Sequence, residues 1–195
     1  KFTGTGGEPK TIAHGLGVSP EMVIIKRTSG VGSWIVWHKD MADNYAFEGL
    51  DNDNAHADGG SPISKYVDAV SSTLVTVGDA GENNNSGDTY IMYCWASVDG
   101  YSKCGSYTGN GNADGTFVYT GFRPAYVMIK GANITSHWQI HDTARSTYNV
   151  MGDQLHANTN DADASNAAYY IDSVSNGFKL RMSHSGQNGS GQFYI

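Results

Sequence analysis

The segment Gly121-Phe122-Arg123-Pro124-Ala125-Tyr126-Val127-Met128-Ile129-Lys130 is followed closely by His137-Trp138-Gln139-Ile140-His141-Asp142. Short apolar runs bounded by Gly, Pro or Ser are typical of β-strands joined by turns. The same pattern occurs earlier, in residues 17–26 and 33–40. The two occurrences keep a fixed spacing of 104 residues (124 − 20 = 104), which relates Pro20 to Pro124, Lys26 to Lys130 and Trp34 to Trp138.

The spacing of 104 residues continues along the chain. Residues 66–71 match residues 170–175, and residues 87–91 match residues 191–195. Agreement over several separated blocks indicates an internal duplication, which decides the fold before any other feature. The sequence therefore predicts two repeats, residues 1–104 and 105–195. The first copy continues past Ile91 into an apolar run, so we expect the last strand of the second copy to come from residues beyond Ile195 or from a neighbouring chain.

The predicted fold class is all-β, a β-sandwich or jelly-roll-like fold. No segment keeps an apolar period of 3.6 residues, and many short β-type runs alternate with turn-rich segments. The pair Asn176-Gly177 predicts a hairpin turn, because Asn-Gly takes a positive φ at little cost. Two architectures remain open, two small sandwiches in tandem or one larger sandwich. The direct run from Tyr90 to Gly111, without a Pro-rich or Ser-rich linker, favours closely packed repeats.

Composition excludes two classes of partner. The formal net charge is −7 and the pI about 5.3, whereas nucleic-acid binding requires clustered Lys and Arg. No apolar run is long enough to span a bilayer, so membrane insertion is not expected. No heptad pattern supports a coiled-coil trimer, although a homo-oligomer remains open. Cys94 and Cys104 are too few for a disulfide framework, and we expect Cys94 to pack as a small apolar residue on a strand.

Three segments resemble a known domain: Gly100–Gly111, Phe117–Tyr126 and Ser175–Arg181. They are similar to a domain of large structural proteins of marine tailed bacteriophages, the cyanophages and their relatives, which are described as tail-fibre-like or virion structural. The resemblance covers nearly the whole chain, and the first copy departs from it at residues 13–20. It implies a β-rich fold, a place on the virion surface, other virion proteins as partners and no catalytic residues, hence a non-enzymatic role.

Aromatic residues and hydrogen-bonding side chains gather in equivalent parts of the two copies. Such a combination is what sugar recognition requires, because aromatic rings stack on the C–H faces of sugars and polar groups bind the hydroxyls. The carbohydrate-binding candidates are Trp37, Tyr45, His141, Arg145 and Tyr148. We interpret Trp34 and Trp138 as core residues. A core position also remains an alternative for Trp37, Tyr45 and Tyr148.

An oxygen-rich loop contains the metal candidates Asp51, Asp53 and Asp58. Ca²⁺ binds several hard oxygens from one flexible loop. However, Gly is absent at the sixth position from Asp51 and Glu at the twelfth, so the loop is not an EF-hand. A solvated turn, in which Asn and Asp side chains bond their own backbone, is the favoured alternative. No other cofactor is expected.

Two functional hypotheses follow from these features. The first is an exposed fibre or receptor-binding module that binds host surface glycans. The second is a capsid or tail decoration subunit that makes only protein–protein contacts, because an open sheet edge invites strand addition from a neighbour. A glycan-degrading enzyme is disfavoured, since no pair of carboxylates is singled out by the sequence.

Overall fold

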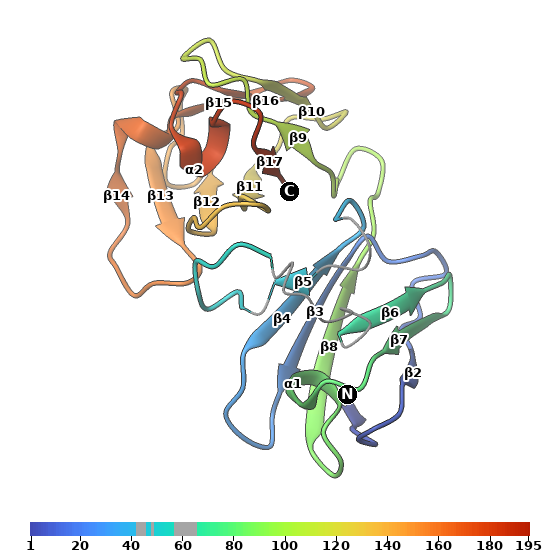
Figure 1. The fold of residues 1–195 in the computed structure, drawn as a ribbon. Helices are drawn as coiled ribbons and strands as arrows, with labels where there is room; N and C mark the ends of the chain where they lie inside the picture. The colour runs from blue at the N-terminus through green and yellow to red at the C-terminus, as the bar shows by residue number, and fades with distance from the viewer. Residues whose placement is uncertain (42–45, 48, 57–65) are drawn as a thin grey trace. The chain divides into compact units, whose positions relative to one another are not determined.

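The computed structural model describes residues 1–41, 46–47, 49–56 and 66–195. The chain divides into two compact units, unit 1 (Lys1–Ser97) and unit 2 (Val98–Ile195). In Figure 1 unit 1 runs from blue to green and unit 2 from light green to red. The strands pair antiparallel throughout the described residues. The predicted all-β, sandwich-like class is therefore confirmed.

The described residues of unit 1 form two sheets. The first has the order β1-β8-β3-β4-β5 and the second the order β2-β7-β6. Apolar side chains of both sheets form one core cluster, so the sheets pack face to face. The bounds of the strands are β1 (Phe2–Thr3), β2 (Lys10–Ala13), β3 (Met22–Arg27), β4 (Trp34–His38), β5 (Ala46–Phe47), β6 (Val67–Val70), β7 (Leu74–Val77) and β8 (Thr89–Trp95).

Unit 2 contains three sheets, with the orders β11-β12-β13-β14, β10-β16-β15 and β17-β9. Its core cluster includes Ile129, Ile171, Leu180 and Tyr194, each at most 1% exposed. The bounds of the strands are β9 (Tyr107–Thr108), β10 (Phe117–Tyr119), β11 (Tyr126–Ile129), β12 (Gln139–Asp142), β13 (Asp153–His156), β14 (Ala164–Ser165), β15 (Ile171–Val174), β16 (Gly177–Leu180) and β17 (Phe193–Tyr194).

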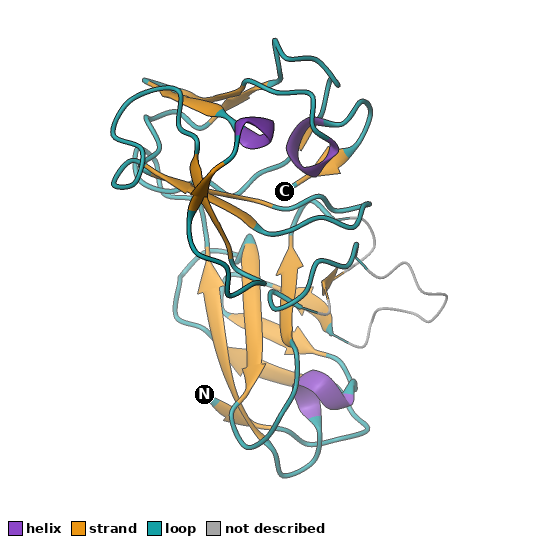
Figure 2. Ribbon diagram, turned by 90° about the vertical axis from the view of Figure 1, so that its left-hand side faces the viewer, coloured by secondary structure: helices purple, strands orange, loops and turns teal. Residues whose placement is uncertain are grey.

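Within the described ranges, helical structure is confined to short turns, which Figure 2 colours purple among the strands. They are α1 (Gly81–Asn84), α2 (Ser185–Asn188) and the 3₁₀ turn η3 (Ala167–Tyr169). The sequence predicted turns, not helices, at the positions of α1 and α2. One helical turn contains too few residues for a helical period to be visible in the sequence.

Alternation of exposed and buried side chains explains why these segments form strands. In β7 Val75 and Val77 are fully buried, whereas Leu74, the first residue of the strand, is 41% exposed. Successive side chains of a strand point to opposite faces, so one face of β7 contributes to the core. Strand β11 shows the same sequence of burial classes.

In each unit, a lysine ammonium lies over the ring of a tryptophan. Lys26 Nζ lies 5.4 Å from the ring centroid of Trp34, and Lys130 Nζ lies 6.0 Å from that of Trp138. Lys130 is fully buried, and its ammonium donates to the carbonyl of Gly131 at 3.1 Å. Trp138 is only 1% exposed, so its predicted core position is confirmed. Trp34 is half-buried.

The hairpin predicted around Asn176-Gly177 is present, but the reason given for its glycine is wrong. Strands β15 and β16 pair from Val174↔Gly177 onward, so Ser175 and Asn176 form the turn and Gly177 begins a strand. Gly177 is not among the glycines of positive φ. Instead, a Cβ at Gly177 would lie 2.1 Å from the carbonyl oxygen of Val118 on β10. Close approach of two backbones, rather than turn geometry, requires glycine there.

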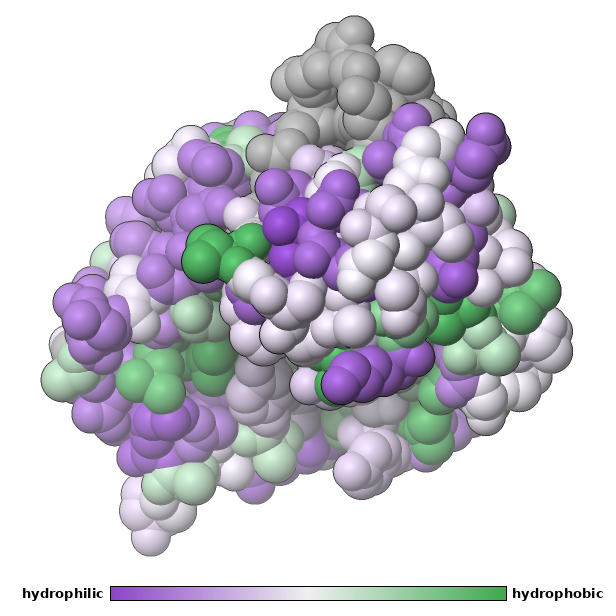
Figure 3. Space-filling view, turned by 90° about the horizontal axis from the view of Figure 1, so that it is seen from below, coloured by the Kyte–Doolittle hydropathy of each residue, from purple (hydrophilic) through white to green (hydrophobic). Residues whose placement is uncertain are grey.

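No helix in the described ranges is long and apolar enough to cross a membrane. On the face of the molecule that Figure 3 presents, hydrophobic residues form small separate patches among hydrophilic ones. Neither Cys94 nor Cys104 forms a disulfide bond. Cys94 packs against the core of unit 1 as predicted, and burial raises its pKa to about 11.

Candidate functional site

The structure places two of the predicted sugar-binding residues in the protein interior. Trp37 on β4 is 6% exposed and belongs to the core cluster of unit 1, where it lies opposite Val23 of β3. His141 on β12 is fully buried. Neither ring offers a face to a ligand, so both assignments are corrected. The sequence could not reveal this, because Trp34–His38 is apolar at four of five positions and shows no alternation.

His141 has a structural partner in unit 2. Its Nε2 lies 2.6 Å from Nε2 of Gln187, a buried residue of α2. Burial, with a smaller contribution from the nearby His156, lowers the pKa of His141 to about 4. The ring is therefore neutral at pH 7 and links β12 to α2 through a hydrogen bond.

Two of the remaining candidates, Arg145 and Tyr148, lie in the loop that follows β12. Tyr148 is 82% exposed. The guanidinium of Arg145 is already engaged, because it pairs with Asp142 and lies 3.6 Å from a carboxylate oxygen of Asp163. Tyr45 lies outside the described residues. Of the predicted set, Tyr148 thus has the accessibility that ligand stacking requires.

Side chains of the oxygen-rich loop of unit 1 accept hydrogen bonds from backbone N–H groups. Oδ1 of Asp51 accepts a hydrogen bond from the backbone N–H of Trp34 at 3.2 Å, and Oδ1 of Asn52 accepts one from the N–H of Asn54 at 3.0 Å. The Asn52 contact is that expected of a solvated turn, whereas the Asp51 contact joins the loop to the start of β4. Asp53 belongs to the same loop, and Asp58 lies outside the described residues. In the described part of the chain, no group of three His, Cys, Asp or Glu side chains is arranged to hold a metal ion.

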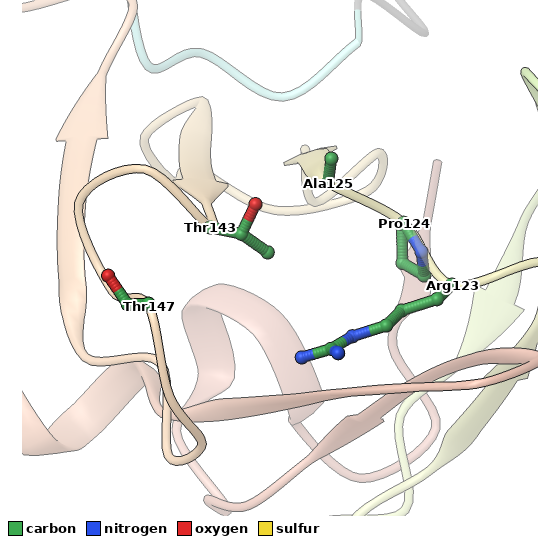
Figure 4. Close-up of a pocket in the computed structure, with 5 residues that line it drawn as sticks. All are labelled: Arg123, Pro124, Ala125, Thr143 and Thr147. Atoms are coloured by element: carbon green, nitrogen blue, oxygen red, sulfur yellow. The ribbon is translucent and has the colours of Figure 1, made fainter.

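A concave site lies at the start of β11 in unit 2, and we call it the Arg123 pocket. Its volume is about 320 Å³, and the residues that line it are Arg123, Pro124, Ala125, Thr143 and Thr147. In Figure 4 the Arg123 side chain extends from the segment before β11 toward the loop that carries Thr147. Two polar hydroxyls, one guanidinium and two small apolar side chains therefore surround one cavity.

Backbone contacts fix the two walls of the Arg123 pocket. The carbonyl of Ala125 accepts a hydrogen bond from the N–H of Thr143 at 3.0 Å, which continues the pairing of β11 with β12. The hydroxyl of Ser173 on β15 donates to the carbonyl of Pro124 at 2.8 Å. Pro124 itself is buried. These bonds join the pocket to two different sheets, so its walls are held by the core of unit 2.

Arg123 differs from the other arginines of the chain. Within the described residues its side chain has no ion pair or hydrogen bond, and it is exposed. The other three of the four arginines pair with aspartates: Arg27 with Asp88, Arg145 with Asp142 and Asp163, and Arg181 with Asp172. Arg123 thus brings an available cationic donor to the pocket.

Two exposed tyrosines adjoin the residues of the Arg123 pocket in sequence. Tyr126 follows Ala125 and is 56% exposed, and Tyr148 follows Thr147. The sequence of residues 121–125 indicated only the entry to a strand and did not reveal the pocket. A charged residue directly before a proline, in a loop, was the available signal, because loop residues on a rigid scaffold are often the ones that bind.

A second pair of exposed aromatic residues was also missed. Tyr93 and Trp95 on β8 are each 41% exposed, and their rings stack with centroids 6.0 Å apart. Their spacing of two residues places them on one face of the strand. Met92 and Cys94, on the other face, pack against the core of unit 1.

Comparisons with known proteins place the chain in a family. A comparison with curated proteins gave no match, and a comparison with solved structures gave none either. The model of one protein family, described as "Domain of unknown function (DUF7483)", matches residues 1–195. The match spans every residue of the sequence, and the chain therefore belongs to the DUF7483 family.

Proposed function

We propose that this chain is a non-enzymatic module exposed on a tailed-phage particle, and that it binds host surface glycans through the Arg123 pocket. The virion role rests on the resemblance of residues 100–111, 117–126 and 175–181 to phage tail-fibre-like and virion structural proteins. The binding role rests on one observation above all. A cavity of about 320 Å³ contains an arginine without an intramolecular partner among the described residues.

The chemistry of the Arg123 pocket suits a sugar. Sugars present hydroxyls around a ring whose faces carry C–H groups. The guanidinium of Arg123 supplies hydrogen-bond donors, and the hydroxyls of Thr143 and Thr147 donate and accept. Small-molecule sites commonly combine an apolar wall with a few placed polar groups. The exposed Ala125 contributes to such a wall, and the exposed ring of Tyr148 offers a surface for stacking.

Binding to immobilised glycans and to host cells tests this proposal. Exposed tyrosines at binding sites often contribute more than 1 kcal/mol, so we expect Tyr148→Ala to weaken binding about tenfold. Tyr101→Ala is the matched control, because Tyr101 is 81% exposed but does not adjoin the Arg123 pocket. Equal glycan binding by the wild type and Tyr148→Ala would show that Tyr148 does not contribute to the binding site. Absence of binding to every glycan and cell type would contradict the function.

A structural subunit is the second candidate, and the edge of β11 favours it. The carbonyl of Ala125 accepts a hydrogen bond from Thr143, so the backbone N–H and C=O groups of Ala125 point toward β12. These groups point to alternate sides along a strand, so those of Val127 and Ile129 also point toward β12. The backbone N–H and C=O groups of Tyr126 and Met128 therefore point away from β12, to the opposite edge of β11. In unit 1 the matching strand β3 is paired on both sides, with β4 and with β8.

An exposed strand edge is a template for pairing with another polypeptide. If the chain serves as such a subunit, the purified chain should bind phage particles that lack it. In the bound state, the amide N–H of Met128 should exchange with solvent more slowly. A chain that stays monomeric and shows no affinity for particles would contradict this second candidate.

A further inference from the structure

The balance of charge around the Arg123 pocket carries information about its ligand. The chain has a formal net charge of −7, which repels anions at long range. The nearest arginine in sequence, Arg145, is neutralised by Asp142 and Asp163. Arg123 remains as a cation whose charge no described carboxylate neutralises. A single positive charge without a partner, on the wall of a cavity, is suited to one negative charge on a ligand.

We propose that the Arg123 pocket binds acidic sugars and that Arg123 pairs with a carboxylate on the sugar ring. This inference rests on the proposed glycan-binding function and adds the class of sugar. The ligand is a uronic acid or another sugar with a carboxylate on its ring, either at a chain end or within a polysaccharide.

The geometry of the guanidinium supports a carboxylate. Arginine presents a planar fork of N–H donors that binds both oxygens of a carboxylate at once, which a neutral hydroxyl cannot match. The two threonine hydroxyls then remain for ring hydroxyls of the same sugar. Ala125, which is exposed, supplies the apolar surface against which the C–H face of the ring lies. Each group that lines the pocket thus has a partner on an acidic pyranose.

A matched pair of oligosaccharides tests the inference on the full chain. The probes are trigalacturonate and the neutral trigalactose obtained when its carboxylates are reduced to alcohols. The two share ring configuration and linkage and differ at C6, where one has a carboxylate and the other a neutral hydroxymethyl group. We expect trigalacturonate to bind about ten- to hundredfold more tightly, the range of a charge-assisted hydrogen-bonded pair in a partly exposed site. Raising the salt concentration should reduce that difference, because mobile ions screen exposed charges.

Three variants separate charge from fork geometry. Arg123→Gln removes the charge, and we expect it to bind both probes with nearly equal affinity. Arg123→Lys keeps the charge without the planar fork, and we expect an intermediate preference for trigalacturonate. Arg181→Gln is the control, because Arg181 is 44% exposed and pairs with Asp172. It should keep the full preference of the wild type.

Different outcomes test this inference and the proposed glycan-binding function separately. If neutral glycans bind as well as trigalacturonate, and Tyr148→Ala weakens the binding of both, the pocket binds sugars without regard to charge. The inference is then overturned and the proposed function stands. If no glycan in either class binds the wild-type chain, both fail. If Arg123→Gln loses the preference for trigalacturonate and Arg181→Gln keeps it, the inference is supported.

Discussion

Two buried asparagines, Asn84 and Asn188, make matching hydrogen bonds in the two units. Oδ1 of Asn84 accepts from the N–H of Thr5 at 2.9 Å, and Oδ1 of Asn188 accepts from the N–H of Asn110 at 3.0 Å. Each Nδ2 donates to two backbone carbonyls. Their positions differ by 104 residues, the spacing of the sequence blocks. A side chain with two donors and one acceptor is what these sites require.

The first prediction concerns Asn188→Ala. The change leaves the carbonyls of Asn112 and Met182 and the N–H of Asn110 without their partner in a site where Asn188 is 1% exposed. We expect unit 2 to lose about 3 kcal/mol of unfolding free energy, because several buried polar groups become unsatisfied together. Urea denaturation measures the loss. Asn160→Ala, at an exposed position, should change stability by less than about 0.5 kcal/mol.

Two tyrosines show the same correspondence at the residue scale. The hydroxyl of Tyr90 donates to the carbonyl of Gly81 at 3.1 Å and accepts from the N–H of Asn85 at 2.9 Å. The hydroxyl of Tyr194 donates to the carbonyl of Ser185 and accepts from the N–H of Gly189 at 2.8 Å. In each unit a buried tyrosine thus closes both ends of a one-turn helix.

At the scale of elements, β9 passes very close to the end of α2. A Cβ placed on Gly109 would lie 2.3 Å from the carbonyl oxygen of Gly189 and 2.7 Å from the carbonyl carbon of Asn188. In unit 1 a Cβ on Gly4 would lie 2.2 Å from the carbonyl oxygen of Asn85. Neither distance leaves room for a side chain, because the contacting atoms belong to the backbone.

The second prediction is therefore that Gly109→Ala destabilises unit 2 by more than about 2 kcal/mol, since the backbone of α2 must shift. Thermal or urea unfolding measures the effect. Gly105→Ala is the matched control in the same stretch of chain, because a Cβ there meets no atom within 4 Å. Equal stability of the two variants would show that α2 moves aside at no cost.

The central strands of each unit were predictable from sequence, and the short ones were not. Strands β3 and β4 lie in the stretches of residues 17–26 and 33–40 where the sequence predicted strands, with β3 ending one residue later, because apolar, β-branched runs between turn residues leave few alternatives. Strands of two residues, such as β1 and β9, contain no detectable period. Tertiary pairing creates them: Phe2 lies opposite Tyr90 in one unit and Tyr107 opposite Tyr194 in the other.

At the scale of the whole molecule, one buried histidine in each unit makes stability depend on pH. Burial lowers the pKa of His38 in unit 1 to about 4, and that of His141 in unit 2 to about 4. In the unfolded chain both titrate near the ordinary value of 6.5. Between these values the unfolded chain binds protons that the folded chain does not. Stability therefore falls as pH decreases from about 6.5 to about 4.

The third prediction follows from this linkage. Each histidine should remove up to about 3 kcal/mol of unfolding free energy over that interval, since one pKa unit corresponds to about 1.4 kcal/mol. Urea unfolding at about pH 7 and about pH 4.5 measures the loss. His141→Phe removes one titrating group, so the pH dependence of unit 2 should decrease. An unchanged dependence in this variant would mean that His141 is not a source of the acid sensitivity.

The sequence by itself determined the antiparallel β class and most long strands, because these depend on local apolar patterns and on turn residues. The exposed position of Tyr148 and the turn at Asp51 were among the alternatives it left open. Only the tertiary structure decided that Trp37 and His141 face the core and that Arg123 lines a pocket. The face of a strand and the partner of a charge depend on contacts between segments far apart in the chain. The Arg123 pocket joins residues 123–125 to Thr143 and Thr147, and no local pattern encodes that meeting.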